Sequence, residues 1–149
     1  MTIAELLKKR GTYVHTTDES GTVAESIAEM ALKKTDVLIV ASHGRPVGIF
    51  TESDVFRCCR LYKTESFSGI KVSQVMSRDI VSASSGDDVK DVLDRMLQKE
   101  IRHLPVFDSG QIAGMLNIND LVREQLEILR GEIHFLNDYI SRLQDAGHD

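Results

Sequence analysis

An internal repeat limits the possible folds of this chain more than its composition does. Residues 48–54 read Gly-Ile-Phe-Thr-Glu-Ser-Asp, and residues 114–120, which lie 66 positions later, read Gly-Met-Leu-Asn-Ile-Asn-Asp. The same ungapped shift aligns the runs 36–40 and 102–106, and it aligns four positions of two helical stripes: Val23, Ile27, Met30 and Ala31 with Val89, Leu93, Met96 and Leu97. A unit of this size cannot bury its apolar face alone, so we expect the two copies to pack on each other.

Each copy ends in an acidic residue at a position that suits ligand binding. Two apolar residues typical of a buried strand follow the glycine, then polar positions, and then Asp54 or Asp120, which should open the next helix. A carboxylate in a first helical turn can cap free N–H groups or accept hydrogen bonds from the vicinal hydroxyls of a ligand. Capping alone explains one such Asp, but its presence in register in both copies favours a shared binding function.

Composition limits the class of protein. The 149 residues are 42% apolar and 28% charged, which allows one compact globular domain or two small units that share a core. No apolar run approaches the roughly 20 residues of a membrane span, and the N-terminus lacks a secretory signal, so we expect a cytoplasmic protein with no membrane partner. The net charge of −5 argues against nucleic-acid binding, although it allows a small phosphate compound as ligand.

The first copy is predicted to occupy residues 1–61, followed by a mostly polar linker over residues 62–71. Thr2 and Glu5 form a capping box that predicts a short N-terminal helix, and Gly11 should end it. Apolar periodicity and turn residues then predict a strand over 13–17, a helix over 22–34, strands over 37–40 and 47–51, and a helix over 53–61.

The second copy is predicted over residues 72–124 with the same order of elements. A short helix at 72–76, a strand over 80–83, a helix capped by Asp88, and strands over 103–107 and 112–117 are expected. Pro105 cannot donate to a strand ladder, so its strand should lie at a sheet edge or beside an opening. The pattern predicts a mixed α/β (α+β) fold in which two tandem β-α-β-β-α repeats pack as a pseudo-twofold pair.

The last helix should extend beyond the repeat, into a C-terminal extension over residues 125–149. Apolar residues recur along it at alternating steps of four and three, the spacing of a coiled-coil heptad: Val122, Leu126, Leu129, Ile133, Leu136, Ile140 and Leu143. Two partners fit this stripe, namely the rest of the same chain or the same helix of a second subunit. Gly131 in its middle costs roughly 1 kcal/mol relative to alanine, so the helix is expected to depend on packing.

Two tandem units that each end in Gly-apolar-apolar-Thr/Asn-x-x-Asp resemble a pair of cystathionine-beta-synthase (CBS) domains, together called a Bateman module. The resemblance covers residues 3–124, and its most specific parts are residues 48–54, 101–106 and 114–120. It implies a regulatory module that binds adenosine compounds such as AMP, ATP, NAD(H) or S-adenosylmethionine in two clefts between the domains. Such modules commonly form disc-shaped homodimers.

Carried over residue by residue, the resemblance implies two ligand sites, each with a ribose-binding Asp from one domain and adenine-facing strands from the other. The first set is Thr51, Asp54, Ile80, Ser82, Arg102, His103 and Pro105. The second set is Val14, Thr16, Asp36, Leu38, Asn117 and Asp120.

The two sets differ in charge. The first holds Arg102 and His103, and an arginine suits forked phosphate contacts. The second has Asp36 at the position equivalent to Arg102, where a carboxylate would repel a phosphate. Asn117 also replaces the usual Thr or Ser of the family, and Ser53 stands where many relatives carry Arg. We therefore expect the first site to bind a nucleotide more strongly than the second, which suits a neutral adenosine or no ligand.

The chain lacks the motifs of common catalytic classes, such as Gly-x-Ser-x-Gly, a Gly-Lys-Ser/Thr phosphate loop or His-Glu-x-x-His. We therefore expect no enzyme activity, no required cofactor and no metal site. The leading hypothesis is an adenosine-nucleotide sensor that signals to a downstream protein through its conformation. The competing hypothesis is a dimeric protein-interaction scaffold whose clefts bind no ligand.

Overall fold

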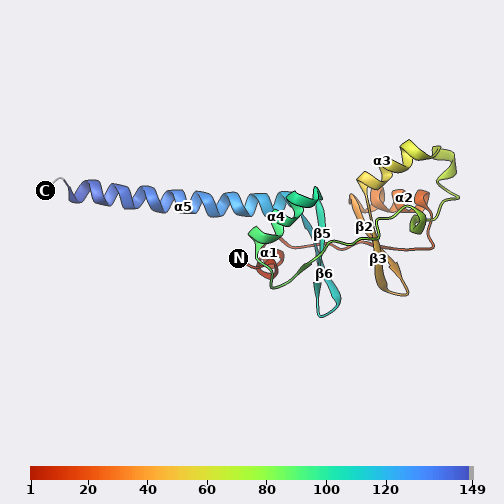
Figure 1. The fold of residues 1–149 in the computed structure, drawn as a ribbon, viewed down its shortest axis with the longest axis horizontal. Coiled ribbons are helices and arrows are strands. Elements are labelled where there is room, and N and C mark those ends of the chain that lie inside the picture. Colours follow the sequence, from red (N-terminus) through yellow and green to blue (C-terminus); the bar gives the residue numbers. More distant parts are fainter. Residues whose placement is uncertain (148–149) are drawn as a thin grey trace. The chain divides into compact units, whose positions relative to one another are not determined.

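The computed structural model describes residues 1–147, and these residues form two packed units (Figure 1). The N unit comprises residues 12–82, and the C unit comprises residues 1–11 together with the chain from residue 83 onward. Each unit contains one three-stranded sheet. The last two residues of the predicted C-terminal extension, 148–149, lie outside the described residues.

The N unit is built around a sheet of order β1-β2-β3. Strand β1 runs parallel to β2, and β2 forms an antiparallel hairpin with β3. The predicted helices and the hairpin are confirmed, whereas the first strand is shorter and starts later than the predicted range 13–17. The elements are β1 (Thr16–Asp18), α2 (Val23–Lys33), β2 (Val37–Ser42), β3 (Arg45–Thr51), α3 (Glu52–Leu61) and the short 3-10 helices η1 (Thr64–Ser66) and η2 (Val72–Gln74).

The stretch between the repeats contributes to the core of the N unit. Phe67 is only 7% exposed, and it packs in the same apolar cluster as Phe50, Val72 and Met76. One aromatic residue among polar neighbours is enough to anchor this connection, because burying its ring contributes a large apolar area. Gly48 is required here, since a Cβ on it would lie 2.5 Å from Met76 Sδ.

The C unit repeats this plan with a sheet of order β4-β5-β6. The capping box predicted from Thr2 and Glu5 is present at the start of the first helix. Of the strand predicted over 80–83 only the last residue is in a strand, because β4 has just two residues. The elements are α1 (Ile3–Arg10), β4 (Ala83–Ser84), α4 (Val89–Lys99), β5 (His103–Asp108), β6 (Gln111–Asn117) and α5 (Ile118–Ala146).

Strand β5 is the central strand of its sheet, so the edge position considered for Pro105 is wrong, and of the two predicted placements only the one beside an opening remains. The ladder between β4 and β5 includes only the pairs Ala83–Val106 and Ser84–Phe107. In the N unit, the equivalent residue Ile39 donates its N–H to His15 O at 2.9 Å. A proline has no N–H for such a bond, so β4 starts one position later in the repeat than β1 does.

The segment that opens each repeat packs on the other repeat. Residues 1–11 belong to the C unit, and residues 70–76 belong to the N unit. Four backbone hydrogen bonds of 2.8–3.0 Å hold the two segments in equivalent ways: Ile3 N to Asp87 O, Val89 N to Met1 O, Val72 N to Gly21 O and Val23 N to Ile70 O. The exchange explains why Ile3 and Leu6 of α1 are buried, at 0% and 1% exposure.

Helix α5 leaves the packed part of the C unit after its first two turns. Leu121 and Glu124 are buried, whereas every large apolar residue from Leu126 to Leu143 is at least 36% exposed. Figure 1 shows α5 continuing past α4 as a single helix. The predicted long helix is confirmed, with 29 residues. No part of the C unit covers its apolar stripe, so the unit does not supply the same-chain partner considered from the sequence.

Candidate functional site

Asp54 is 6% exposed, and both of its carboxylate oxygens are occupied. Oδ2 accepts hydrogen bonds from Thr51 N at 2.9 Å and Thr51 Oγ1 at 3.3 Å. Oδ1 accepts a hydrogen bond from Ser77 Oγ at 3.2 Å and forms an ion pair with Arg57 at 3.1 Å. A carboxylate accepts about four hydrogen bonds, so these contacts fill its capacity. Asp54 therefore caps the start of α3 and ties it to the chain that follows η2.

The partners Ser77 and Arg57 were not predicted from the sequence. Arg57 lies one turn after Asp54, and its guanidinium also donates to Val75 O. Ser77 follows Met76, and its backbone forms two 2.9 Å hydrogen bonds with Ile49. The spacing of Asp54 and Arg57 was a readable signal for an ion pair within one helix. No signal in the repeat marks Ser77, because it lies in the opening segment of the second copy and the opening segment of the first copy contains no serine.

Asp120 holds the equivalent position in α5 but is in a different state. Its side chain is half-buried, and within residues 1–147 no hydrogen bond or ion pair engages its carboxylate. The cap of α5 comes from Asn117, whose Oδ1 accepts a hydrogen bond from Asn119 N at 2.8 Å. Because the amide of Asn117 does the capping, the carboxylate of Asp120 is available to other donors.

Arg102 and His103 lie beside the start of α5 in the same unit. Arg102 O accepts a hydrogen bond from Ile118 N at 2.9 Å, and His103 pairs with Asn117 across the ladder of β5 and β6. The Arg102 side chain is exposed, and none of the described residues forms a hydrogen bond or ion pair with its guanidinium. A cation, an amide and a carboxylate therefore surround the N-terminus of a long helix, whose dipole attracts anions.

The N unit contains the same arrangement with the opposite charge. Glu52 N donates to Asp36 O at 3.0 Å, and Val37 pairs with Thr51 across the ladder of β2 and β3. Asp36 thus takes the place that Arg102 holds in the C unit. The structure brings Asp36 together with Thr51 and Asp54, and it brings Arg102 and His103 together with Asn117 and Asp120. The combinations across units, such as Arg102 with Asp54, stay predictions.

The remaining predicted site residues lie on or near the first strand of each sheet. Thr16 starts β1, Val14 precedes it, and Ile80 and Ser82 lie in the irregular segment before β4. Leu38 is 0% exposed within the apolar cluster of the N unit, so a ligand could meet only its backbone. Pro105 is likewise buried, in β5.

A group of four charges joins α1 to α5 away from these residues. Lys9 and Arg10 form ion pairs of 2.9–3.3 Å with Glu124 and Glu127, and the Glu124 side chain is only 3% exposed. Hydrogen bonding to Glu127 and Glu124 raises the pKa of Lys9, and hydrogen bonding to Lys9 lowers the pKa of Glu127. The group fixes the direction in which α5 leaves the C unit, and no pattern in the sequence predicted it.

Comparison with known proteins identifies the family. The family model of the CBS domain matches residues 3–60 and again residues 72–127. The chain belongs to the CBS-domain family. A 17.7 kDa protein encoded in the bps2 3′ region of Acidianus ambivalens is 33% identical over 119 residues, which cover 78% of this chain and 70% of that protein. The crystal structure of the CBS domain NE2398 is 28% identical with a TM-score of 0.78, and the match covers 85% of this chain and 98% of that one.

Two more distant CBS structures share the fold and hold adenosine compounds. The protein PAE2072 from Pyrobaculum aerophilum, complexed with AMP, is 21% identical with a TM-score of 0.73, over 87% of this chain and 97% of that one. The CBS domain pair of MJ0100, in complex with 5′-methylthioadenosine and S-adenosylmethionine, is 19% identical with a TM-score of 0.70, over 89% and 98% of the two chains. Within residues 1–147, no helix has the length and apolar character needed to cross a membrane.

Proposed function

We propose that this CBS-domain protein is a regulatory module that binds an adenosine nucleotide and signals through its conformation to a downstream protein. The observation that carries the proposal is the group at the start of α5. There the unpartnered carboxylate of Asp120 can accept hydrogen bonds from ribose hydroxyls, and the unpartnered guanidinium of Arg102 can donate to a phosphate. The amide group of Asn117 lies beside them, and the three side chains together supply donors and acceptors that match a nucleoside monophosphate.

The comparisons support this class of ligand, because one protein of the same fold holds AMP and another holds 5′-methylthioadenosine and S-adenosylmethionine. The site that we propose combines Arg102 of the first set given by the resemblance with Asn117 and Asp120 of the second, and the roles of the other residues in the two sets remain predictions. We propose a cytoplasmic protein and a regulatory rather than a catalytic role, with the nucleotide as a regulatory ligand and not as a reaction cofactor.

From charge alone, the site with Asp54 was expected to bind a nucleotide more strongly than the site with Asp120. The contacts of the two aspartates favour the opposite order. A ribose hydroxyl can bind Asp54 only by displacing Ser77 or Arg57, because four contacts already fill its carboxylate. Asp120 requires no such displacement. We therefore assign the stronger ribose contact to Asp120 and the phosphate contact to Arg102, and we assign Asp54 mainly a structural role.

Titration calorimetry with AMP and with adenosine tests this assignment. A hydrogen bond to a charged group contributes about 1.5–3 kcal/mol, so Arg102→Ala should weaken AMP binding roughly 10- to 150-fold and leave adenosine binding unchanged. Asp120→Asn should weaken both ligands. Arg142→Ala, which removes the same charge from an exposed position of α5 more than 20 residues beyond Asp120, is the matched control. Equal losses for AMP and adenosine in Arg102→Ala would contradict the phosphate role.

The competing function is a dimeric scaffold that binds proteins and no small molecule. Thermal melts with AMP, ATP, NADH and S-adenosylmethionine distinguish the two functions. A ligand at 100 times its dissociation constant stabilises the native state by about 2.7 kcal/mol. If none of the four compounds raises the melting temperature, the scaffold is the better description.

A further inference from the structure

The exposed part of α5 requires a partner that the C unit does not supply. Its seven heptad residues, from Val122 to Leu143, are each 38–56% exposed and form one continuous seam. Most helical stability in proteins comes from the packing of an amphipathic face, and Gly131, on which a Cβ would meet nothing within 4 Å, weakens this helix further. The helix is therefore expected to be stable only when another helix covers the seam.

We propose that α5 pairs with α5 of a second copy of this chain as a parallel, in-register, two-stranded coiled coil. Leu126, Ile133 and Ile140 occupy one core position of the heptad, termed a. The other core position, d, is occupied by Val122, Leu129, Leu136 and Leu143. β-branched residues at a with leucine at d favour two parallel strands over three or four, and two of the three a residues and three of the four d residues follow this rule. Pairing through this seam does not depend on nucleotide binding.

The residues that flank the seam are compatible with this register. In a parallel pair, each g position faces the e position five residues later on the other helix. This places Gln125 opposite Arg130, Glu132 opposite Asn137 and Tyr139 opposite Gln144, so no two like charges face each other. Each half-exposed seam residue can bury on the order of 50 Å² of apolar surface. With the flanking side chains, two copies then cover on the order of 1,000 Å², the minimum for a specific interface.

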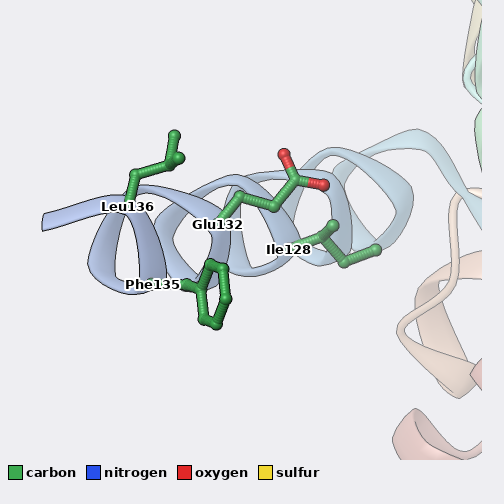
Figure 2. Close-up of a pocket in the computed structure, with 5 residues that line it drawn as sticks. Ile128, Glu132, Phe135 and Leu136 are labelled. Atoms are coloured by element: carbon green, nitrogen blue, oxygen red, sulfur yellow. The ribbon is translucent and has the colours of Figure 1, made fainter. Parts of the chain in front are cut away.

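A second apolar surface on α5 lies beside the seam, but it does not suit the tight contact. Ile128, Gly131, Glu132, Phe135 and Leu136 line a hollow on the helix, which Figure 2 shows with the carboxylate of Glu132 among the apolar side chains. A contact centred there would bury this carboxylate, and an unpaired buried charge is costly. Pairing through positions a and d instead leaves Glu132 at the solvent-exposed edge of the interface. We therefore expect the heptad seam to be the face that is buried.

Disulfide trapping of the full-length chain tests the orientation. In a Cys59→Ser background, which removes the exposed native thiol, Leu143→Cys should form a covalent dimer on mild oxidation because the two d positions meet across the axis. Asp138→Cys, on the opposite face of the helix, is the matched control and should remain uncoupled. If Leu143→Cys couples only when it is mixed with Leu126→Cys, the helices are antiparallel and the proposal is wrong.

Size-exclusion chromatography with light scattering tests the seam itself. The wild type should be a dimer at micromolar concentration, Ile133→Asp with Leu136→Asp should be a monomer, and Phe135→Asp should stay dimeric. These three side chains are 55–70% exposed, so the variants should keep the fold of both units, which circular dichroism can verify. A monomeric wild type, or a dimer that survives both seam charges, would overturn the proposal. Nucleotide titration of the monomeric variant separates this result from the proposed function.

Discussion

Asp54 and Asp120 occupy the same place in the repeat, so the same substitution at both positions measures what the contacts of Asp54 are worth. Asp54→Ala removes the cap interaction with Thr51, which is worth about 1 kcal/mol. It also removes the contacts of a buried carboxylate with Ser77 and Arg57, where hydrogen bonds to charged groups contribute about 1.5–3 kcal/mol. The Arg57 side chain is 41% exposed, so its ion pair counts for little. We expect Asp54→Ala to lower the free energy of unfolding by about 3 kcal/mol.

Asp120→Ala removes no contact among the described residues and should change the same free energy by less than about 0.5 kcal/mol. Urea denaturation followed by circular dichroism, without ligand and at one fixed protein concentration, gives both values. In thermal melts about 3 kcal/mol corresponds to a decrease of roughly 6–12 °C for a chain of this size. If the two variants lose equal stability, the four contacts of Asp54 are not stabilising and the assignment of its structural role fails.

Two further perturbations test the packing and the charges. Gly48→Ala should destabilise the protein by about 1–3 kcal/mol in urea denaturation, because its Cβ would collide with Met76 at 2.5 Å, whereas Gly86→Ala, which meets nothing within 4 Å, should be nearly neutral. Lys9 lowers the pKa of Glu127, so this pair stabilises the folded state above the ordinary carboxyl pKa of 4.5 and loses its effect as pH falls through the depressed value. Lys9→Met should therefore flatten the acid side of the stability profile, and an unchanged profile would contradict the ion pair.

The architecture was predictable because the repeat carries redundant information. The glycine, the apolar pair and the acidic residue occur twice, and the stripes of α2 and α4 align at the same shift, so an error in one copy is corrected by the other. The order of strands within a sheet leaves no such trace. Pro105 allowed an edge position or a place beside an opening, and the sequence did not decide between them. Strand β5 can be central because the ladder with β4 includes Val106 and Phe107 but not the proline.

The sequence predicted which residue types form the candidate site, but it did not predict which of their side chains already have hydrogen-bond partners. Asp54 and Asp120 align in the repeat, and only the side chains around them separate a saturated carboxylate from an available one. Ser77 reaches Asp54 from a segment 23 positions later. Asn117 departs from the usual Thr or Ser of the family, and it is the residue that leaves Asp120 unpartnered. Such effects depend on packing in three dimensions and are not encoded in spacing along one helix.

The exchange of opening segments makes the two halves of this chain inseparable. Cleavage between residues 61 and 72 would separate each unit from the opening segment that packs on it. The first fragment would keep residues 1–11, which belong to the C unit, and the second would keep residues 72–76, which belong to the N unit. Neither fragment would be a smaller version of the whole. Shortening the N-terminus by ten residues should therefore destabilise the C unit, which contains the later repeat, more than the N unit.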